Sequence, residues 1–216
     1  MIENFLECSE YARNLFFDDN DVVNLKKYAI DLNVPIVTDE VLAYMIFMAK
    51  SINAQSCLEI GTAVGYSAYY LSKYMKVATI EIDEIRYNKA SEVLFGRNVD
   101  MHLGDALEVI PTLSDTYDFI FIDAAKGQYR KFFDLCYDKL NEGGLIFIDN
   151  LLFRGYVCSK EYPKRYKTIV KNLREFIEYL KKYNFVLLPF GDGVGLIRKG
   201  KWWKKEYFVL FLWLCF

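Results

Sequence analysis

Residues 58–67 read Leu-Glu-Ile-Gly-Thr-Ala-Val-Gly-Tyr-Ser, a short apolar run that ends in a loop with two glycines. Gly61 and Gly65 allow sharp turns and a close approach of backbone to ligand. The residues after Gly65 predict a helix whose first N–H groups face the same loop. The stretch therefore predicts a strand–loop–helix unit with a ligand site beyond the carboxyl end of the strand.

Apolar runs alternate with amphipathic helical stretches on both sides of this loop. We expect strands at about 57–60, 77–82, 99–103, 117–122, 144–148, 185–190 and 194–198, and helices at about 38–52, 66–74, 84–95, 106–113, 126–140 and 163–183. This order predicts an α/β fold with a seven-stranded, mostly parallel sheet and helices on both faces. The turn at 191–193, Gly-Asp-Gly, predicts a hairpin that adds an antiparallel C-terminal edge strand.

The pattern indicates one domain over residues 1–199, opened by two amphipathic helices within about 1–33 that break at 18–21. Residues 200–216 form an atypical apolar tail that contains all three tryptophans. Two interpretations of the tail stay open. It binds a partner or touches a membrane, or it is an accidental extension without function.

Composition bounds the class of protein. The chain has 216 residues, 53% of them hydrophobic, and a formal net charge of −2, values typical of a folded globular protein. Its five cysteines are scattered and form no CxxC pair, so we expect reduced thiols. The N-terminus lacks the pattern of a signal peptide, and the tail is too short to span a bilayer. We expect a cytoplasmic protein with no membrane partner.

Acidic residues at strand ends favour one cofactor over others. Glu59 precedes the glycine loop, where it suits an ammonium or sulfonium group better than a pyrophosphate. Glu81 ends the second strand, where an acid binds ribose hydroxyls, and Asp105 follows the third strand near the expected adenine edge. The spacing G-x-x-x-G differs from the G-x-G-x-x-G of dinucleotide binders. The combination favours S-adenosylmethionine over a nicotinamide or flavin nucleotide, although each feature alone is typical of an ordinary turn or strand end.

Two later strands also end in oxygen-bearing side chains, Asp123 and the pair Asp149-Asn150. Neighbouring strand ends would bring them together as ligands for Mg²⁺, or Mn²⁺. The alternative is that they cap the following helices. Lys126 is expected on the first turn of a helix, against the helix dipole, which suggests a general base or, alternatively, a solvated or phosphate-contacting lysine. The single histidine, His102, is more typical of a structural residue.

Together these motifs resemble the cation-dependent O-methyltransferases, which include the catechol and caffeoyl-CoA enzymes. The resemblance covers about residues 30–198 and implies the class I methyltransferase fold and a homodimer. It implies Asp123, Asp149 and Asn150 as metal ligands and Lys126 as the catalytic base. The cofactor contacts expected from the motifs and the resemblance are Val37, Glu59, Gly61, Thr62, Gly65, Tyr66, Ser67, Glu81, Asp105, Ala106 and Asp123.

Within that family, residues 122–134 (IDAAKGQYRKFFD) and 149–157 (DNLLFRGYV) look most like the bacterial tRNA 5-hydroxyuridine methyltransferases. The resemblance implies formation of 5-methoxyuridine at the wobble position of the tRNA anticodon loop. A catechol-like aromatic diol is the alternative acceptor, because both acceptors offer two adjacent oxygens to a cation. A cofactor-binding module without catalysis is the alternative of another class.

The charge distribution bears on this choice. Residues 154–174 hold seven basic side chains against the single acid Glu161, whereas residues 1–40 hold nine acids against three basic side chains. A basic segment directly after Asp149-Asn150 suits the phosphates around a loop nucleotide. Interleaved tyrosines at 156, 162 and 166 could stack on bases. The predicted RNA contacts are Arg154, Lys160, Lys164 and Arg165. A solvated helix face explains the same charges without RNA.

Overall fold

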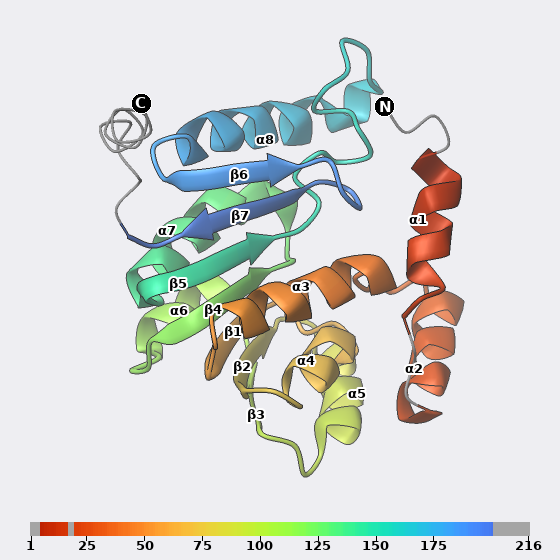
Figure 1. Cartoon of the computed structure of the whole chain (residues 1–216), viewed down its shortest axis with the longest axis vertical. Coiled ribbons are helices and arrows are strands. Elements are labelled where there is room, and N and C mark those ends of the chain that lie inside the picture. Colours follow the sequence, from red (N-terminus) through yellow and green to blue (C-terminus); the bar gives the residue numbers. More distant parts are fainter. Residues whose placement is uncertain (1–4, 17–19, 201–216) are drawn as a thin grey trace, which may run out of the picture.

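The structure, a computed structural model, describes residues 5–16 and 20–200 of the chain (Figure 1). Residues 201–216 of the apolar tail and part of the predicted break between the first two helices lie outside the described residues. Within the described ranges, none of the helices has the length and apolar character that a bilayer crossing requires.

Seven strands form one sheet across the described part of the chain, in the order β3-β2-β1-β4-β5-β7-β6. They are β1 (Ser56–Ile60), β2 (Lys76–Glu81), β3 (Val99–Leu103), β4 (Tyr117–Ile122), β5 (Leu140–Ile148), β6 (Asn184–Leu188) and β7 (Val194–Arg198). Strands β1 to β5 pair in parallel, and β7 runs antiparallel to both β5 and β6. The predicted α/β class, strand count and antiparallel C-terminal edge are confirmed, with β7 as the reversed strand and β6 outside it.

Helices cover both faces of this sheet (Figure 1). The described helices are α1 (Phe5–Arg13), α2 (Asn20–Asp31), α3 (Asp39–Ser51), α4 (Tyr66–Leu71), α5 (Glu84–Leu94), α6 (Ala106–Thr112), α7 (Tyr129–Lys139) and α8 (Lys167–Leu180), with 3₁₀ turns η1 (Lys126–Gln128) and η2 (Lys164–Tyr166). One buried cluster joins the sheet to α2, α3, α4 and α5, and a second joins it to α6, α7 and α8. The sheet is thus the middle of three layers.

Alternation along the central strands explains the two clusters. Phe119 and Phe121 of β4 belong to the first cluster, and Ile120 and Ile122 belong to the second. Successive side chains of a strand point to opposite faces, so a strand that is buried on both faces reads as a continuous apolar run. The continuous apolar run that predicted β4 is therefore explained by burial on both faces of the sheet.

The N-terminal helices stand beside the carboxyl ends of the parallel strands (Figure 1). Arg13 of α1 donates to both carboxylate oxygens of Glu40 at 3.0 and 3.1 Å. Lys26 of α2 donates to Asp39 Oδ2 at 2.6 Å, and Asp39 Oδ1 accepts from the Tyr66 hydroxyl at 2.7 Å. These bonds attach α1 and α2 to α3 and α4, and hence to one wall of the pocket described below.

Two predicted helices begin later than expected. The turn η1 precedes α7, so the predicted start at Lys126 is wrong and Lys126 lies ahead of the helix. The turn η2 likewise precedes α8, so that helix begins at Lys167 and not at the predicted Pro163. Gly127 disfavours an α-helical first turn, and a 3₁₀ turn is a common lead-in to an α-helix. The helix after the glycine loop ends at Leu71, because the Tyr74 N–H bonds back to the Leu71 carbonyl as a tighter turn.

Candidate active site

A cavity of about 440 Å³ lies beyond the carboxyl ends of β1 to β5. Its walls come from the loops that follow these strands and from the segment between α2 and α3. Of the residues predicted for the site, those that line it are Val37, Gly61, Thr62, Tyr66, Ser67, Glu81, Asp105, Ala106, Asp123, Lys126, Asp149 and Asn150. The volume falls within the range of small-ligand pockets. One cavity therefore holds both predicted halves of the site.

The glycine loop passes very close to the end of β4. A Cβ atom on Gly61 would lie 2.2 Å from the Asp123 carbonyl oxygen, and the Gly61 φ angle is +101°. Gly65 has a φ of +88° and stands at the N-terminus of α4, where a Cβ would lie 3.3 Å from side-chain atoms of Ala90 and Leu94. Both positions combine a left-handed backbone with close neighbours. This explains why glycine occupies them.

Glu59 lies beneath the loop and not in the pocket lining. It is fully buried, and its two oxygens accept from Ser67 Oγ and Thr79 Oγ1, each at 2.5 Å. The Thr79 hydroxyl also bonds the Thr62 hydroxyl at 2.6 Å. Burial raises the pKa of Glu59 to about 7, although the two hydroxyl donors oppose that rise. The structure thus places Glu59 as a support for two lining residues, and not at the direct contact that its sequence position suggested.

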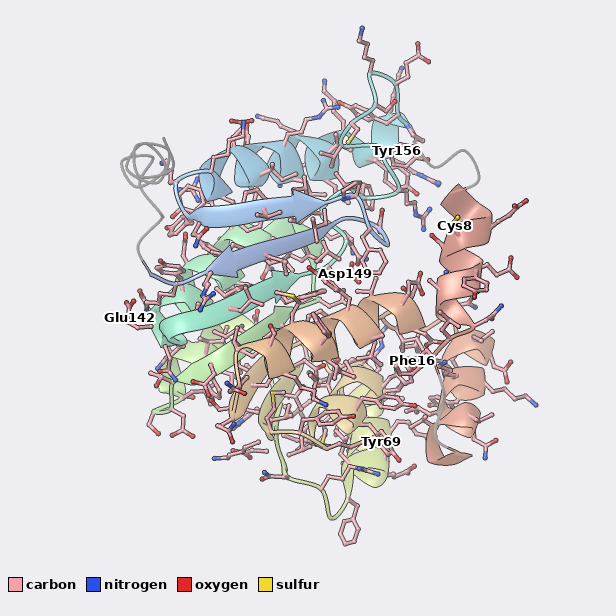
Figure 2. The ribbon with its side chains drawn as sticks, in the orientation of Figure 1. Cys8, Phe16, Tyr69, Glu142, Asp149 and Tyr156 are labelled. Carbon is pink, nitrogen blue, oxygen red and sulfur yellow. The ribbon has the colours of Figure 1, made fainter. Side chains whose placement is uncertain are left out.

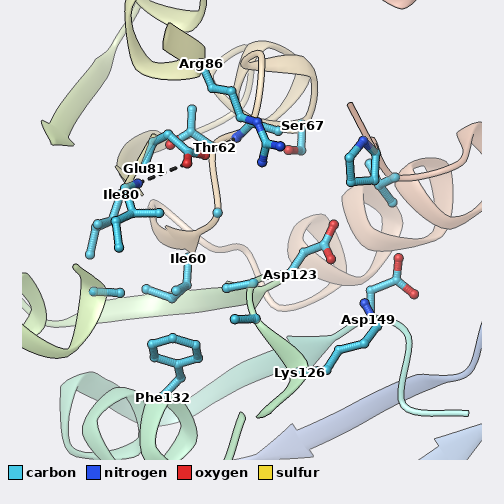
Figure 3. Close-up of a pocket in the computed structure, with 18 of the residues that line it drawn as sticks. Ile60, Thr62, Ser67, Ile80, Glu81, Arg86, Asp123, Lys126, Phe132 and Asp149 are labelled. Carbon is cyan, nitrogen blue, oxygen red and sulfur yellow. Dashed lines mark hydrogen bonds between the residues drawn. The ribbon is translucent and has the colours of Figure 1, made fainter. Parts of the chain in front are cut away.

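Glu81 faces the pocket from the end of β2 (Figure 3). Its Oε2 accepts from the Ala63 N–H at 2.7 Å, and its Oε1 accepts from the N–H groups of Ile82 and Asp83 at 3.0 and 2.9 Å. These donors orient the carboxylate at the glycine loop, and a carboxylate can accept further bonds. Asp105 lines the same end and caps α6 by accepting from the Leu107 N–H at 2.9 Å.

The other end of the pocket is acidic. Asp123 and Asp149 point toward the same space with Lys126 beside them (Figure 3). Figure 2 places Asp149 at the tip of β5, and Asp149 is only 4% exposed. Burial, and then the charge of Asp123, raise the pKa of Asp149 to about 7. Burial also raises the pKa of Asp123, which the Lys126 ammonium opposes.

Lys126 reaches back from η1 to this acidic end. Its Nζ donates to Asn150 Oδ1 at 2.8 Å and lies 6.0 Å from the centre of the Tyr129 ring. The Tyr129 hydroxyl donates to the Asp149 carbonyl oxygen at 3.1 Å. Residues of η1 and α7 are thereby joined to both residues that follow β5. The helix-dipole argument for Lys126 does not apply, because α7 begins only at Tyr129.

The donor set fits a hard divalent cation. Two crowded carboxylates with raised pKa values and one amide oxygen are the ligands that Mg²⁺ or Mn²⁺ prefers, and a nearby positive charge would relieve their repulsion. Among the described residues, no group of three His, Cys, Asp or Glu side chains is placed to hold a metal ion. The predicted set differs from such a group because its third member is Asn150.

The model of one known family matches residues 9–200, which is most of the chain, under the description O-methyltransferase. The chain belongs to this O-methyltransferase family. A solved Staphylococcus aureus structure, described as a caffeoyl-CoA O-methyltransferase, shares 30% identity and a TM-score of 0.79, over 92% of this chain and 98% of that one. The caffeoyl-CoA O-methyltransferase of Petroselinum crispum is 29% identical over 176 residues, or 72% of this chain and 73% of the relative.

The predicted methyltransferase fold is confirmed by the likeness of this O-methyltransferase to solved methyltransferase structures. The Podospora anserina methyltransferase PaMTH1, solved with SAH bound, has a TM-score of 0.81 at 23% identity, over 93% of this chain and 97% of that chain. At that identity the likeness concerns the fold alone. The family model and the relatives at about 30% identity confirm the predicted resemblance to the caffeoyl-CoA enzymes. The predicted closeness to the tRNA-modifying branch stays a prediction.

Sequence reasoning missed part of the O-methyltransferase pocket. Arg86 of α5 and Phe132 of α7 line it, and both are visible in Figure 3. Pro35 and Ile36 line it beside the predicted Val37. Pro35, Ile36 and Arg86 lie outside the quoted motifs, and Phe132 lies within residues 122–134, where the spacing alone did not mark it as part of the pocket.

The predicted RNA contacts lie outside the pocket lining. Arg154, Lys160, Lys164 and Arg165 are all exposed. Arg174 of the same basic segment instead donates to carbonyl oxygens of the loop that follows β5, including Ser159 at 2.6 Å. The four predicted contacts are thus exposed to solvent, whereas Arg174 has a structural role.

The tyrosines of the basic segment are less free than predicted. The rings of Tyr156 and Tyr166 stack on each other at 5.5 Å, and Phe153 meets Tyr166 edge-on at 5.1 Å. Tyr162 packs against the Arg174 guanidinium at 5.4 Å. Figure 2 shows Tyr156 in the loop beyond Asp149. Because these rings already pack within the protein, a base could use only their outer faces.

Proposed function

We propose that this chain is an S-adenosylmethionine-dependent and divalent-metal-dependent O-methyltransferase. The observation that carries the proposal is the continuity of the pocket. A glycine loop and the Glu81 carboxylate form one end, and Asp123, Asp149 and Asn150 form the other. A methyl donor held at the first end would present its methyl group to an oxygen held at the second.

The chain's own residues then have distinct tasks. Glu81 binds ribose hydroxyls, Asp105 and Ala106 border the adenine, and Ser67 binds the amino-acid part of the donor. Asp123, Asp149 and Asn150 would hold the cation, and Lys126 would take or steer the proton of the acceptor hydroxyl. A cation bound there would favour the acceptor oxyanion and fix its orientation. The sulfonium supplies both the methyl group and the leaving group.

For the acceptor we propose the wobble 5-hydroxyuridine of tRNA, converted to 5-methoxyuridine. The exposed basic side chains Arg154, Lys160, Lys164 and Arg165 support an acceptor that carries phosphates. A catechol-like aromatic diol is the second candidate, favoured by the likeness to caffeoyl-CoA O-methyltransferases. A homodimer and a cytoplasmic location belong to the same proposal.

The test offers both acceptors to the purified chain with S-adenosylmethionine and Mg²⁺. The first acceptor is tRNA from a strain that lacks the gene for this chain, and the second is catechol. We expect 5-methoxyuridine by mass spectrometry, and no product with EDTA or with Asp149→Ala. Asp115→Ala is the matched control. Asp115 is an exposed acid just before the amino end of β4, whereas the pocket lies beyond the carboxyl ends of the strands.

Each other outcome has a defined meaning. Methylated catechol without methylated tRNA would replace the RNA acceptor by the small molecule. Full activity in EDTA would remove the metal from the proposal. Tight cofactor binding without transfer to either acceptor would favour a non-catalytic binding module.

A further inference from the structure

The hairpin turn between β6 and β7 packs on the loop that follows β5. The Leu152 N–H donates to the Asp192 carbonyl at 2.9 Å, and the Leu151 N–H donates to the Gly193 carbonyl at 2.9 Å. The Asp192 carboxylate in turn accepts from the Arg154 N–H. Asp192 therefore holds this loop through both its backbone and its side chain.

The loop held in this way has an uncommon backbone. Asn150, Phe153 and Arg154 have φ angles of +59°, +44° and +56°. Asparagine tolerates the left-handed region, but phenylalanine and arginine rarely occupy it. Such conformations persist where the surroundings hold them in place. The Arg154 N–H is one point at which the loop is held, and Asp192 is its acceptor.

The hairpin tip itself has little room to move. A Cβ on Gly193 would lie 2.4 Å from the Leu152 Cγ atom, and one on Gly191 would lie 2.6 Å from the Val41 Cγ2 atom of α3. The tip thus lies between α3 and the loop after β5. This packing holds the Asp192 carboxylate against the Arg154 N–H.

Asp192 interacts electrostatically with Lys126 and Asp149 at the acidic end of the pocket. Burial raises the pKa of Asp192, while the Arg154 N–H and the Lys126 charge oppose that rise. The Asp192 charge in turn contributes to the raised pKa of Asp149. Asp192 does not line the cavity, so it acts through other residues.

We propose that Asp192 is a positioning residue for the acceptor end of the site. By accepting from the Arg154 N–H, it holds the 150–154 loop, in which Asn150, Phe153 and Arg154 are left-handed, and so keeps Asn150 Oδ1 within reach of Lys126. The functional part of this inference rests on the proposed methyl transfer. The loop part concerns the protein alone and has a separate readout.

Hydrogen exchange at the loop amides of the full chain tests the loop part. In Asp192→Ala we expect the Arg154 amide to exchange at least about 10-fold faster, because its acceptor is gone and the loop opens locally. Asp192→Asn should retain protection, since an amide oxygen still accepts. Asp115→Ala is the matched control. Unchanged protection in Asp192→Ala, or equal loss in Asp192→Asn, would overturn the inference.

Steady-state kinetics test the functional part. We expect Asp192→Ala to lower kcat/KM for the acceptor by about 10- to 100-fold, because a misplaced acceptor site loses orientation. The Kd for S-adenosylmethionine should stay within about twofold of wild type, and Asp192→Asn should recover most of the loss. An equal loss of cofactor affinity would reduce Asp192 to a general structural role and overturn the proposal.

Two further experiments distinguish failure of the Asp192 proposal from misfolding of the variant and from failure of the proposed function. If the alanine variant does not fold, Asp192→Glu replaces it, since the longer side chain keeps the charge and displaces the accepting oxygens. We expect faster Arg154 exchange there too, and wild-type exchange would count against the inference. If the wild-type chain transfers no methyl group, the proposed function fails, but the exchange result still decides whether Asp192 holds the loop.

Discussion

Lys126 Nζ donates a hydrogen bond to Asn150 Oδ1 at 2.8 Å, although the two residues lie 24 positions apart in the sequence. The amide oxygen that receives it is one of the three proposed metal ligands. The proposed base therefore forms a hydrogen bond to one of the oxygens proposed to bind the cation. This contact places the lysine beside the acceptor end of the pocket.

Replacing Lys126 with methionine should abolish most of the transfer. The substitution keeps the length of the side chain and removes the amine, and loss of a general base costs about 10²- to 10⁴-fold in kcat. Lys131→Met is the control, because Lys131 is an exposed lysine of α7. Initial rates and calorimetric binding of S-adenosylmethionine provide the measurements. A fall in cofactor affinity that matches the fall in rate would contradict the assigned role.

Replacing Gly61 with alanine should disturb both folding and cofactor binding. The new Cβ would meet the Asp123 carbonyl oxygen at 2.2 Å in a left-handed backbone. We expect a loss of more than about 2 kcal/mol in the free energy of unfolding, since strain and collision act together. Gly96→Ala is a matched control, because Gly96 has a φ of +75° but no heavy atom within 4 Å of its added Cβ.

Only backbone strain should act at Gly96, at about 1 to 2 kcal/mol. Urea unfolding compares the two variants. Equal losses in both would show that the close approach of the glycine loop to β4 contributes nothing measurable.

Replacing Glu81 with glutamine should weaken cofactor binding. The Glu81 oxygens already accept three backbone N–H groups, so an amide nitrogen in place of one oxygen opposes a donor and removes the charge. Charge-assisted hydrogen bonds are worth about 1.5 to 3 kcal/mol, which corresponds to a loss of affinity of about 10- to 100-fold. Glu84→Gln is the control on the exposed first turn of α5. Calorimetry that shows equal affinities for the two variants would remove Glu81 from the cofactor site.

Replacing Glu59 with glutamine should change the pH dependence of stability. The pKa of buried Glu59 is raised from 4.5 to about 7, so folding favours its protonated form. The stability that this carboxyl contributes is fully present below its unfolded pKa and is lost as pH rises through about 7. Glutamine does not titrate and should not show this loss.

The free energy of unfolding of Glu59→Gln, minus that of wild type, should therefore rise by about 3 kcal/mol between pH 4.5 and pH 8. Urea unfolding of the cofactor-free proteins at several pH values gives this difference. A difference that stays constant with pH would show that Glu59 keeps an ordinary pKa in the folded protein.

Some residues of the site could be predicted from the sequence, and others could not. Gly61, Glu81 and Asp149 were predicted because strand-end motifs carry their own signal, and all three line the cavity. Glu59 was predicted to contact the cofactor, but both its oxygens are taken by hydroxyls beneath the loop. Spacing identifies which residue ends a strand. It does not show whether that side chain faces the ligand or the core.

The sequence by itself determined the fold class and the order of the elements, because apolar periodicity and turn glycines are local signals along the chain. The family came from the resemblance of its strand-end motifs to those of known O-methyltransferases. Only the tertiary structure decided how Lys126 meets Asn150, which residues beyond the motifs line the pocket, and how Asp192 holds the loop after β5. Those contacts join segments far apart in the chain, and their geometry depends on the packing of the whole sheet. Physical proximity of that kind leaves no periodic trace in a single sequence.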